Sequence, residues 1–145
     1  MKKMILILAI AGSTLSAFAG EETVNSKVLN SFNAEFKAAK DVVWTTGADF
    51  YTASFIYNNK YINAFYDTEG GLIGITRYIS LLDLPMNLQI NIKNNYGNFW
   101  VSDLFEVSKH ESTSYYITLE NADSKLVLKS YGGSDWSSFK KVKKI

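Results

Sequence analysis

The sequence predicts an α+β fold in which helices pack on one face of an antiparallel sheet. Apolar residues recur at helical spacing near the start of the chain, and runs rich in aromatic and β-branched residues follow them. The same order of patterns then returns in the second half of the 145-residue chain. The predicted architecture is therefore a tandem repeat of one helix plus about four antiparallel strands, with the repeats at about residues 23–80 and 84–145.

The chain begins MKKMILILAIAGSTLSAFAG, which is typical of a secretory signal. Two lysines precede an apolar run, and the small residues that follow end in Ala17-Phe18-Ala19. The run is shorter than the roughly 20 residues of a membrane-spanning helix, and a buried N-terminal helix is the less favoured alternative. We expect cleavage of residues 1–19 after Ala19, or alternatively after Gly20. Residues 20–145 would then form a single periplasmic or secreted domain.

Composition argues against several classes of function. Without the signal, lysine plus arginine fall from 15 to 13 against 14 acidic residues, so the net charge changes from +1 to −1. This balance does not suggest a nucleic-acid partner, and the basic tail KKVKKI is interpreted as solvated. Cysteine is absent, which excludes disulfides and thiolate sites. After the signal no apolar stretch is long enough to span a membrane, and no pattern indicates an oligomeric state.

The first helix is predicted from Val24, Val28, Phe32 and Phe36, which recur every four residues and form one apolar stripe. The segment KAAKD ends it. Four strands are then predicted in the runs DVVW, DFYTASFIY, KYINAFYD and LIGITRYIS. Between the second and third runs, Asn58-Asn59 suits a two-residue hairpin, because asparagine tolerates positive φ.

The hairpin sets a register that sorts the side chains into two faces. We predict the core face from its small and apolar residues, the pairs Ala53–Ala64 and Phe55–Ile62. The opposite face mixes hydroxyl, amide and aromatic groups in the pairs Ile56–Tyr61, Ser54–Asn63 and Thr52–Phe65. Because only one face can be covered by the helix, the second face is expected to stay open.

The second half repeats this pattern. The segment YYITLENADSKLVLKSY overlays YTASFIYNNKYINAFYD without a gap, and each predicted core position is apolar in both. A second helix should precede it, in LPMNLQINIKNNYG, where Pro85 suits the first turn. Leu88 and Ile92 continue at helical spacing, although alternation from Met86 to Ile92 also permits a strand. The repeat favours the helix, and SLLDL joins the halves.

The stretch FYDTEGGLIG is interpreted as a turn. Asp67 can accept hydrogen bonds from nearby backbone N–H groups, and Gly70 can adopt the left-handed conformation that closes a type I turn with a bulge. A helix–loop–helix calcium site needs glycine at its sixth position and glutamate at its twelfth, where this chain has Leu72 and Tyr78. A phosphate-binding loop needs Gly-Lys-Ser/Thr, which is also missing. No metal or cofactor is expected.

Catalytic patterns are weak. His110 is the one histidine and lies in the polar stretch SKHESTS, whereas zinc sites take several His or Cys ligands. Ser137 and Lys140 form an S-x-x-K pattern, but the S-D-N and K-T-G elements of penicillin-binding enzymes are absent. The three tryptophans, Trp44, Trp100 and Trp136, suit packing better than stacking on a ligand. We therefore predict that the protein is not an enzyme and has no catalytic residues.

The order of motifs resembles the β-lactamase-inhibitor-like, PepSY-like proteins that Bacteroidetes-type bacteria export. The resemblance rests on Phe32 and Phe36, on DVVW, on Ala64-Phe65-Tyr66-Asp67 with Gly70, and on Leu84-Pro85. It covers nearly all of the predicted mature chain, and is clearer in the first half, because Tyr131-Gly132-Gly133-Ser134 replaces the Asp-x-x-Gly turn in the second. The resemblance implies a tandem α+β repeat with one open sheet face and no catalytic residues.

These observations favour a non-catalytic binding module, with an inhibitor of an exported enzyme as one possibility. The expected partner is another envelope or secreted protein. Aromatic side chains among polar groups are typical of interfaces, and the open face supplies Ile56, Tyr61, Phe65 and Tyr116 as predicted binding residues. The alternative is a periplasmic carrier of a small ligand, such as a lipid, sugar or peptide.

Overall fold

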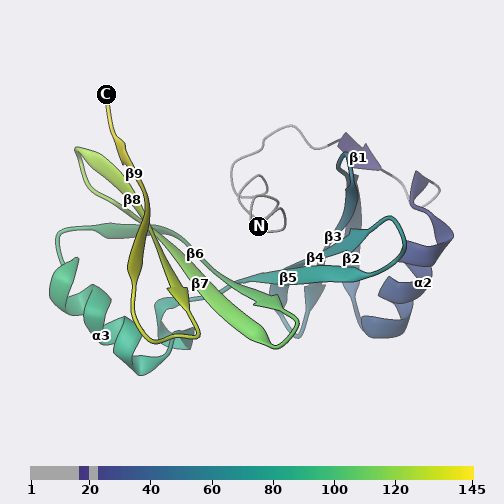
Figure 1. Cartoon of the computed structure of the whole chain (residues 1–145), viewed down its shortest axis with the longest axis horizontal. Helices are drawn as coiled ribbons and strands as arrows, with labels where there is room; N and C mark the ends of the chain where they lie inside the picture. Colours follow the sequence, from purple (N-terminus) through teal and green to yellow (C-terminus); the bar gives the residue numbers. More distant parts are fainter. Residues whose placement is uncertain (1–16, 20–22) are drawn as a thin grey trace.

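The computed structural model describes residues 17–19 and 23–145 (Figure 1). This part of the chain forms two α-helices, a short 3-10 helix and nine strands. Their bounds are β1 Ala17–Ala19, α2 Ser26–Glu35, β2 Lys40–Thr46, β3 Phe50–Tyr57, β4 Lys60–Asp67, β5 Leu72–Tyr78, η2 Leu81–Asp83, α3 Met86–Asn95, β6 Trp100–Lys109, β7 Ser112–Glu120, β8 Ser124–Tyr131 and β9 Ser137–Lys143.

The described strands form one antiparallel sheet in which each strand pairs with the next along the chain. Within each half, short turns of two to five residues explain this order, because strands joined by such turns lie side by side. After β1, the chain runs through a helix and four strands, and then through a second helix and four strands. The predicted α+β class with an antiparallel sheet is confirmed.

Local sequence explains both helices. Asn25 caps α2, and its Oδ1 accepts a hydrogen bond from the Val28 backbone N–H at 3.0 Å. Val28 and Phe32 are buried, as their spacing predicts. The alternation that permitted a strand after Pro85 is instead part of α3, in which Leu88 and Ile92 are buried. Pro85 lies one residue earlier than predicted, at the N-cap.

The predicted hairpin register is confirmed. Asn58 and Asn59 have φ values of 50° and 61°, which asparagine tolerates better than most residues. Strands β3 and β4 pair over their whole lengths in the predicted register. All four predicted core residues are buried: Ala53, Phe55, Ile62 and Ala64.

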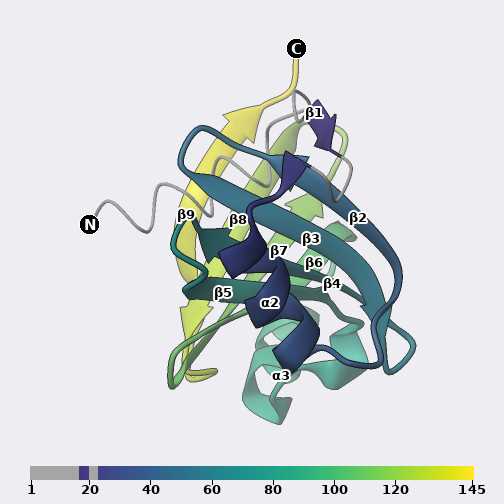
Figure 2. The same ribbon diagram turned by 90° about the vertical axis from the view of Figure 1, so that its right-hand side faces the viewer.

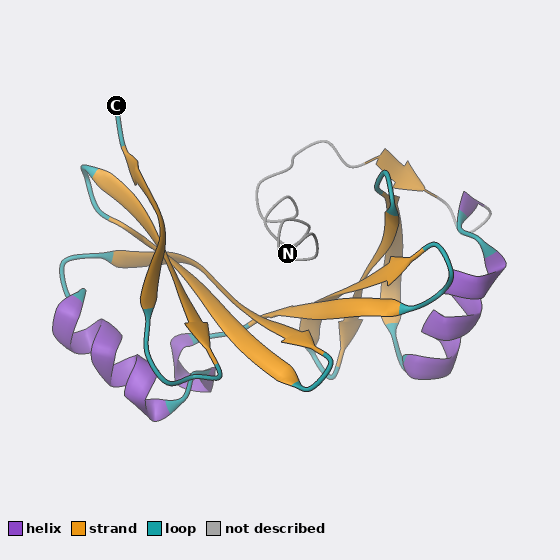
Figure 3. Ribbon diagram, in the orientation of Figure 1, coloured by secondary structure: helices purple, strands orange, loops and turns teal. Residues whose placement is uncertain are grey.

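Both helices cover the same face of the sheet. Helix α2 packs over β2–β5 in one apolar cluster, and α3 packs over β6–β8 in another. The register places Ile75 of the first cluster and Leu104 of the second on one sheet face. The helices therefore lie on the outside of the curved sheet, and the helix-free face lines its inside (Figures 1 and 3). Figure 2 looks onto α2 in front of the strands that it covers.

The Asp67–Gly70 turn is confirmed and also fixes α2. The Asp67 Oδ1 accepts hydrogen bonds from the backbone N–H groups of Glu69 and Gly71, each at 2.9 Å, and Gly70 has φ 86°. The Asn25 Nδ2 donates to the Thr68 carbonyl at 2.7 Å. The β8–β9 turn approaches α3 in a similar way, because the Asn87 Nδ2 donates to the carbonyls of Gly133 and Ser134.

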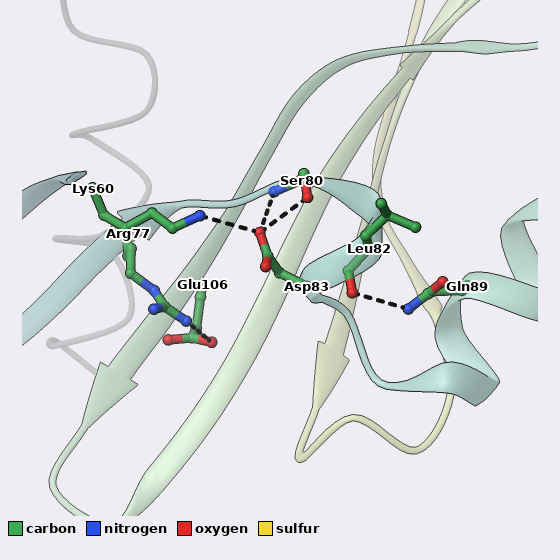
Figure 4. Close-up of polar contacts among 7 residues, drawn as sticks. All are labelled: Lys60, Arg77, Ser80, Leu82, Asp83, Gln89 and Glu106. Carbon is green, nitrogen blue, oxygen red and sulfur yellow. Dashed lines mark hydrogen bonds and ion pairs between the residues drawn. The ribbon is translucent and has the colours of Figure 1, made fainter. Parts of the chain in front are cut away.

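The two halves meet at a narrow seam. Strands β5 and β6 pair through four residue pairs, fewer than the nine of β6–β7. Figure 4 shows the polar contacts around this seam. The Arg77 Nη2 lies 3.2 Å from the Glu106 Oε2, and the Lys60 Nζ lies 3.5 Å from the Asp83 Oδ2. The Ser80 N–H and hydroxyl both donate hydrogen bonds to the Asp83 Oδ2, and these bonds fix the start of η2. They also lower the pKa of Asp83.

The expected signal falls mainly outside the described residues. Of residues 1–19, only β1 is described, and it pairs with the outer edge of β2 from Trp44 to Thr46. Cleavage after Ala19 or Gly20 stays a prediction, as do the proposed domain bounds.

Replacing Tyr66 by phenylalanine is expected to stabilise the protein. The Tyr66 hydroxyl is buried and has no hydrogen-bond partner among the described residues, and an unpaired buried polar group costs about 1–3 kcal/mol. Burial, followed by the Glu35 carboxylate, raises the pKa of Tyr66. The ionisation of Tyr66 therefore leaves stability unchanged below the unfolded pKa of about 10, and lowers it progressively as the pH rises from there through the folded pKa.

Chemical denaturation between pH 7 and pH 11 measures this effect. The Tyr66→Phe variant should be more stable at pH 7 by about 1 kcal/mol and should lose less stability at alkaline pH. Tyr61→Phe is the matched control, because Tyr61 is exposed. A loss of stability at pH 7 would show that the hydroxyl has a favourable partner.

Candidate functional site: the helix-free face

One residue from each of six neighbouring strands forms a line across the helix-free face. We call this line the cross-strand row: Ile56, Tyr61, Tyr78, Phe105, Tyr116 and Lys129. The register pairs its members directly from β3 to β4 and from β5 to β8. Between β4 and β5, the pair Ile62–Arg77 places Tyr61 opposite Tyr78. Because residues paired across an antiparallel sheet share a face, the whole row points away from both helices.

The rings of the row contact one another in the second half. Phe105 and Tyr116 stack with ring centroids 5.2 Å apart and planes 10° apart. Tyr78 meets Phe105 edge to face at 6.3 Å, and Phe139 of β9 meets Tyr116 in the same way at 5.6 Å. Ring pairs of this kind add about 0.5–1.5 kcal/mol beyond area burial, so the row has a rigid aromatic centre.

Lys129 ends the row inside a cage of aromatic rings. Its Nζ lies 4.0 Å from the centroid of Tyr131, 4.9 Å from that of Tyr116 and 5.9 Å from that of Phe139. Only 4% of the Lys129 surface is exposed. These distances allow cation–π attraction, which is stronger where water is excluded.

A polar ladder lies beside the row in the first half. The Ser54 Oγ donates to the Asn63 Oδ1 at 2.6 Å, and the Asn63 Nδ2 donates to the Thr76 Oγ1 at 3.3 Å. The Asn63 amide is therefore fixed by the neighbouring strands. Beyond the ladder, Thr52 and Phe65 are buried, and the Phe65 ring lies 6.4 Å from that of Phe50. Thr52 and Phe65 therefore present little surface, whereas Ser54 and Asn63 of the ladder are only half-buried.

The structure distinguishes the four predicted binding residues by exposure. Ile56, Tyr61 and Tyr116 belong to the cross-strand row, and Phe65 lies on the same face farther along β4. Tyr61 is 68% exposed and Ile56 is half-buried. Phe65 and Tyr116 are only 2% and 7% exposed, so they pack beneath the surface and offer little area for a partner to contact.

Sequence reasoning missed Tyr78 and Phe105. Tyr78 is 53% exposed and Phe105 is half-buried between two rings. The sequence predicts LIGITRYIS as a strand, but it indicates neither which strand lies beside it nor in which register. The pairing of β5 with β6 skips η2 and α3, and therefore no turn in the sequence indicates its register.

The charges of this face are partly paired. Burial raises the pKa of Asp103, against the opposing effects of the Leu104 N–H and of Lys125, and burial together with Asp103 raises the pKa of Tyr78. The Lys144 Nζ lies 3.1 Å from the Glu120 Oε1 and 4.8 Å from the Trp100 ring centroid. The pKa of Glu120 is lowered by hydrogen bonds from Ser102 and Lys144.

Of the other sequence candidates, Trp100 departs from the predicted packing, because it is 53% exposed. His110 is exposed in the β6–β7 turn with φ 54°. The Ser137 Oγ donates to the Lys129 carbonyl at 3.1 Å, which fixes β9 against β8. Trp44 is buried, and the Trp136 Nε1 donates to the Leu88 carbonyl at 3.2 Å. Within residues 17–19 and 23–145, no group of three or more acidic, His or Cys residues could hold a metal ion, and no helix is long and apolar enough to cross a membrane.

Known proteins resemble this chain in structure. No model of a protein family matches the chain, and no curated protein matches it in sequence. A BLIP-like protein from Bacteroides fragilis is 17% identical, with a TM-score of 0.67, covering 82% of this chain and 85% of that one. A DUF2874 family protein from Bacteroides ovatus is 20% identical, with a TM-score of 0.73 and coverages of 83% and 88%.

A third neighbour is a candidate periplasmic protein from Bacteroides eggerthii, 11% identical, with a TM-score of 0.72 and coverages of 83% and 88%. At these identities the likeness establishes a shared fold. It agrees with the β-lactamase-inhibitor-like fold that the sequence resembled. None of these three neighbours is described as PepSY-like, and that part of the resemblance stays a prediction.

Proposed function

We propose that this protein is an exported, non-catalytic binding module of the cell envelope that holds another protein against its helix-free face. The observation that carries this proposal is the cross-strand row. Tyr61 and Tyr78 are both exposed at opposite positions of neighbouring strands, and the stacked Phe105–Tyr116 pair follows Tyr78 in the same row. Interfaces are enriched in tyrosine, and hot-spot side chains lie in rigid, well-packed surroundings.

The proposed location rests on two further observations. The first residues of the chain have the order of a secretory signal. One structural neighbour is described as a candidate periplasmic protein, and another as BLIP-like. A protein partner of the same compartment is therefore the natural occupant, and inhibition of an exported enzyme is one form that such capture would take.

We also propose that the two halves are copies of one structural unit. Ala53 pairs with Ala64 in the first half, and Ile117 pairs with Leu128 at the equivalent positions of the second. Superposing an experimental structure of residues 23–80 on residues 84–145 tests this idea. The proposal would be contradicted if Ala53 and Ile117 did not superpose.

Alanine at both Tyr61 and Tyr78 is expected to weaken partner capture. Truncating a hot-spot side chain costs about 2 kcal/mol or more, so the double variant should lose roughly thirtyfold or more in affinity. Both side chains are exposed, and folding should therefore be unaffected. The measurement is recovery of a crosslinked partner from envelope extract of the source organism, with residues 20–145 as bait.

Met86→Ala/Ile90→Ala is the matched control. These side chains are 68% and 51% exposed, close to the values of Tyr61 and Tyr78, but they lie on α3. The proposal predicts that the control keeps the partner and the tyrosine variant loses it. Equal recovery by a folded tyrosine variant would contradict the proposal, and a small molecule co-purifying with the protein would favour the carrier alternative.

A further inference from the structure

Lys129 is a buried cation without a carboxylate. Lys129 belongs to none of the ion pairs Lys27–Glu69, Lys60–Asp83, Arg77–Glu106 and Lys144–Glu120. Lysine is rarely buried without a partner, because removing an ammonium from water is costly. Cation–π attraction to the three surrounding rings offsets part of that cost.

The ammonium nevertheless keeps its proton. Burial lowers the pKa of Lys129, but the hydroxyls of Tyr116 and Tyr131 raise it, and the net direction is upward. The site therefore presents a positive charge at neutral pH. Its geometry is already fixed, because the Phe105–Tyr116 stack holds one wall and Phe139 holds another.

Two acidic side chains on this part of the face have cationic neighbours other than Lys129. On the same face, the Glu120 Oε1 forms an ion pair with the Lys144 Nζ at 3.1 Å. Lys125 favours the charged form of the half-buried Asp103. Lys140, whose pairing with Val127 places it on this face, adds a further positive charge. An anion that reaches Lys129 would therefore meet a site with excess positive charge.

We propose that Lys129 receives a carboxylate from an Asp or Glu side chain of the protein partner, beneath the edge of the Tyr131 ring. This inference rests on the proposed function of the face and specifies the chemistry of the partner. Tyr131 is 56% exposed and covers the Nζ at 4.0 Å, so it is the side chain that the incoming acidic group would touch first. A charge-assisted hydrogen bond in a site closed by rings is stronger than one in water.

The test uses two short, acetylated and amidated peptides, one alternating glycine with glutamate and the other alternating glycine with glutamine. Each is titrated into residues 20–145, and NMR signals of the Lys129 side chain and the Tyr131 ring are followed. The glutamate peptide should bind roughly tenfold more tightly than the glutamine peptide, with the largest shifts at Lys129 and Tyr131. Added salt should weaken the binding of the glutamate peptide.

Two lysine variants complete the test. Lys129→Met keeps most of the apolar stem and should reduce binding of the glutamate peptide to the level of the glutamine peptide. Lys93→Met is the control, because Lys93 is exposed on α3, on the opposite face of the sheet, and it should change the affinity by less than about twofold. The wild-type titration locates the site even if Lys129→Met fails to fold.

Equal binding of the two peptides, or shifts centred away from Lys129, would overturn the inference. The proposed function is tested separately by partner capture through Tyr61 and Tyr78. If capture needs those tyrosines but is unchanged in Lys129→Met, the proposed binding face stands and the proposed carboxylate contact is wrong. Loss of capture in Lys129→Met, with Lys93→Met unaffected, would support both.

Discussion

Replacing Phe32 by alanine is expected to lower the free energy of unfolding by about 3–5 kcal/mol. Phe32 is buried on α2, and its ring meets Trp44 and Phe55 edge to face at 5.1 Å each. It also lies 5.6 Å from Phe36. Alanine would leave a cavity where one helix side chain joins two strands, and the remaining rings cannot fill it without leaving their own positions.

Urea denaturation of the full domain measures this loss. Asn33→Ala is the control, because Asn33 is the next residue on α2 and is exposed. Its effect should stay within about 0.5 kcal/mol. A loss below about 1 kcal/mol for Phe32→Ala would mean that the first core does not hold α2 through this ring.

Alanine at Gly70 is expected to destabilise the protein more than alanine at Gly132. Both glycines have positive φ, 86° and 65°, so both variants carry the left-handed cost of about 1–2 kcal/mol. A Cβ at Gly132 would meet no atom within 4 Å, whereas a Cβ at Gly70 would lie 2.7 Å from the Lys27 carbonyl oxygen. The overlap with helix backbone raises the expected cost of Gly70→Ala to roughly 2–5 kcal/mol.

The difference between these two variants isolates the contact between the turn and α2. It is measured by denaturation of both variants under the same conditions. Equal losses would show that α2 can move away from the turn at little cost. A larger loss at Gly70 would show that the β4–β5 turn fixes the start of α2, through Asn25 and Lys27 as well as through close approach.

Local patterns explain why the first half could be predicted closely. A two-residue turn at Asn58-Asn59 leaves one register, and one-face burial then decides which side chains are core. Asp67 and Gly70 likewise satisfy a turn from their own chemistry. In α3, a spacing of four residues prevails over alternation, because Leu88 and Ile92 face the sheet while Met86 and Ile90 do not.

Non-local pairing explains what could not be predicted. Tyr78 joins Phe105 only because β5 pairs with β6 across a connection that contains η2 and α3. The burial of Phe65 and Tyr116 also depends on neighbouring rings, Phe50 for the first and Phe105 with Phe139 for the second. Alternation assigned both residues to the open face, but it carries no information on how that face is filled.

The direction of the cross-strand row also limits the size of what it can hold. The row crosses six strands, from β3 to β8, and neighbouring strands are about 4.8 Å apart, so it measures roughly 24 Å along the sheet. That length matches about 16 residues of α-helix or about seven residues of extended chain. A partner element that touches both Ile56 and Lys129 would thus run across the strands rather than along them. A shorter element would reach only one end of the cross-strand row.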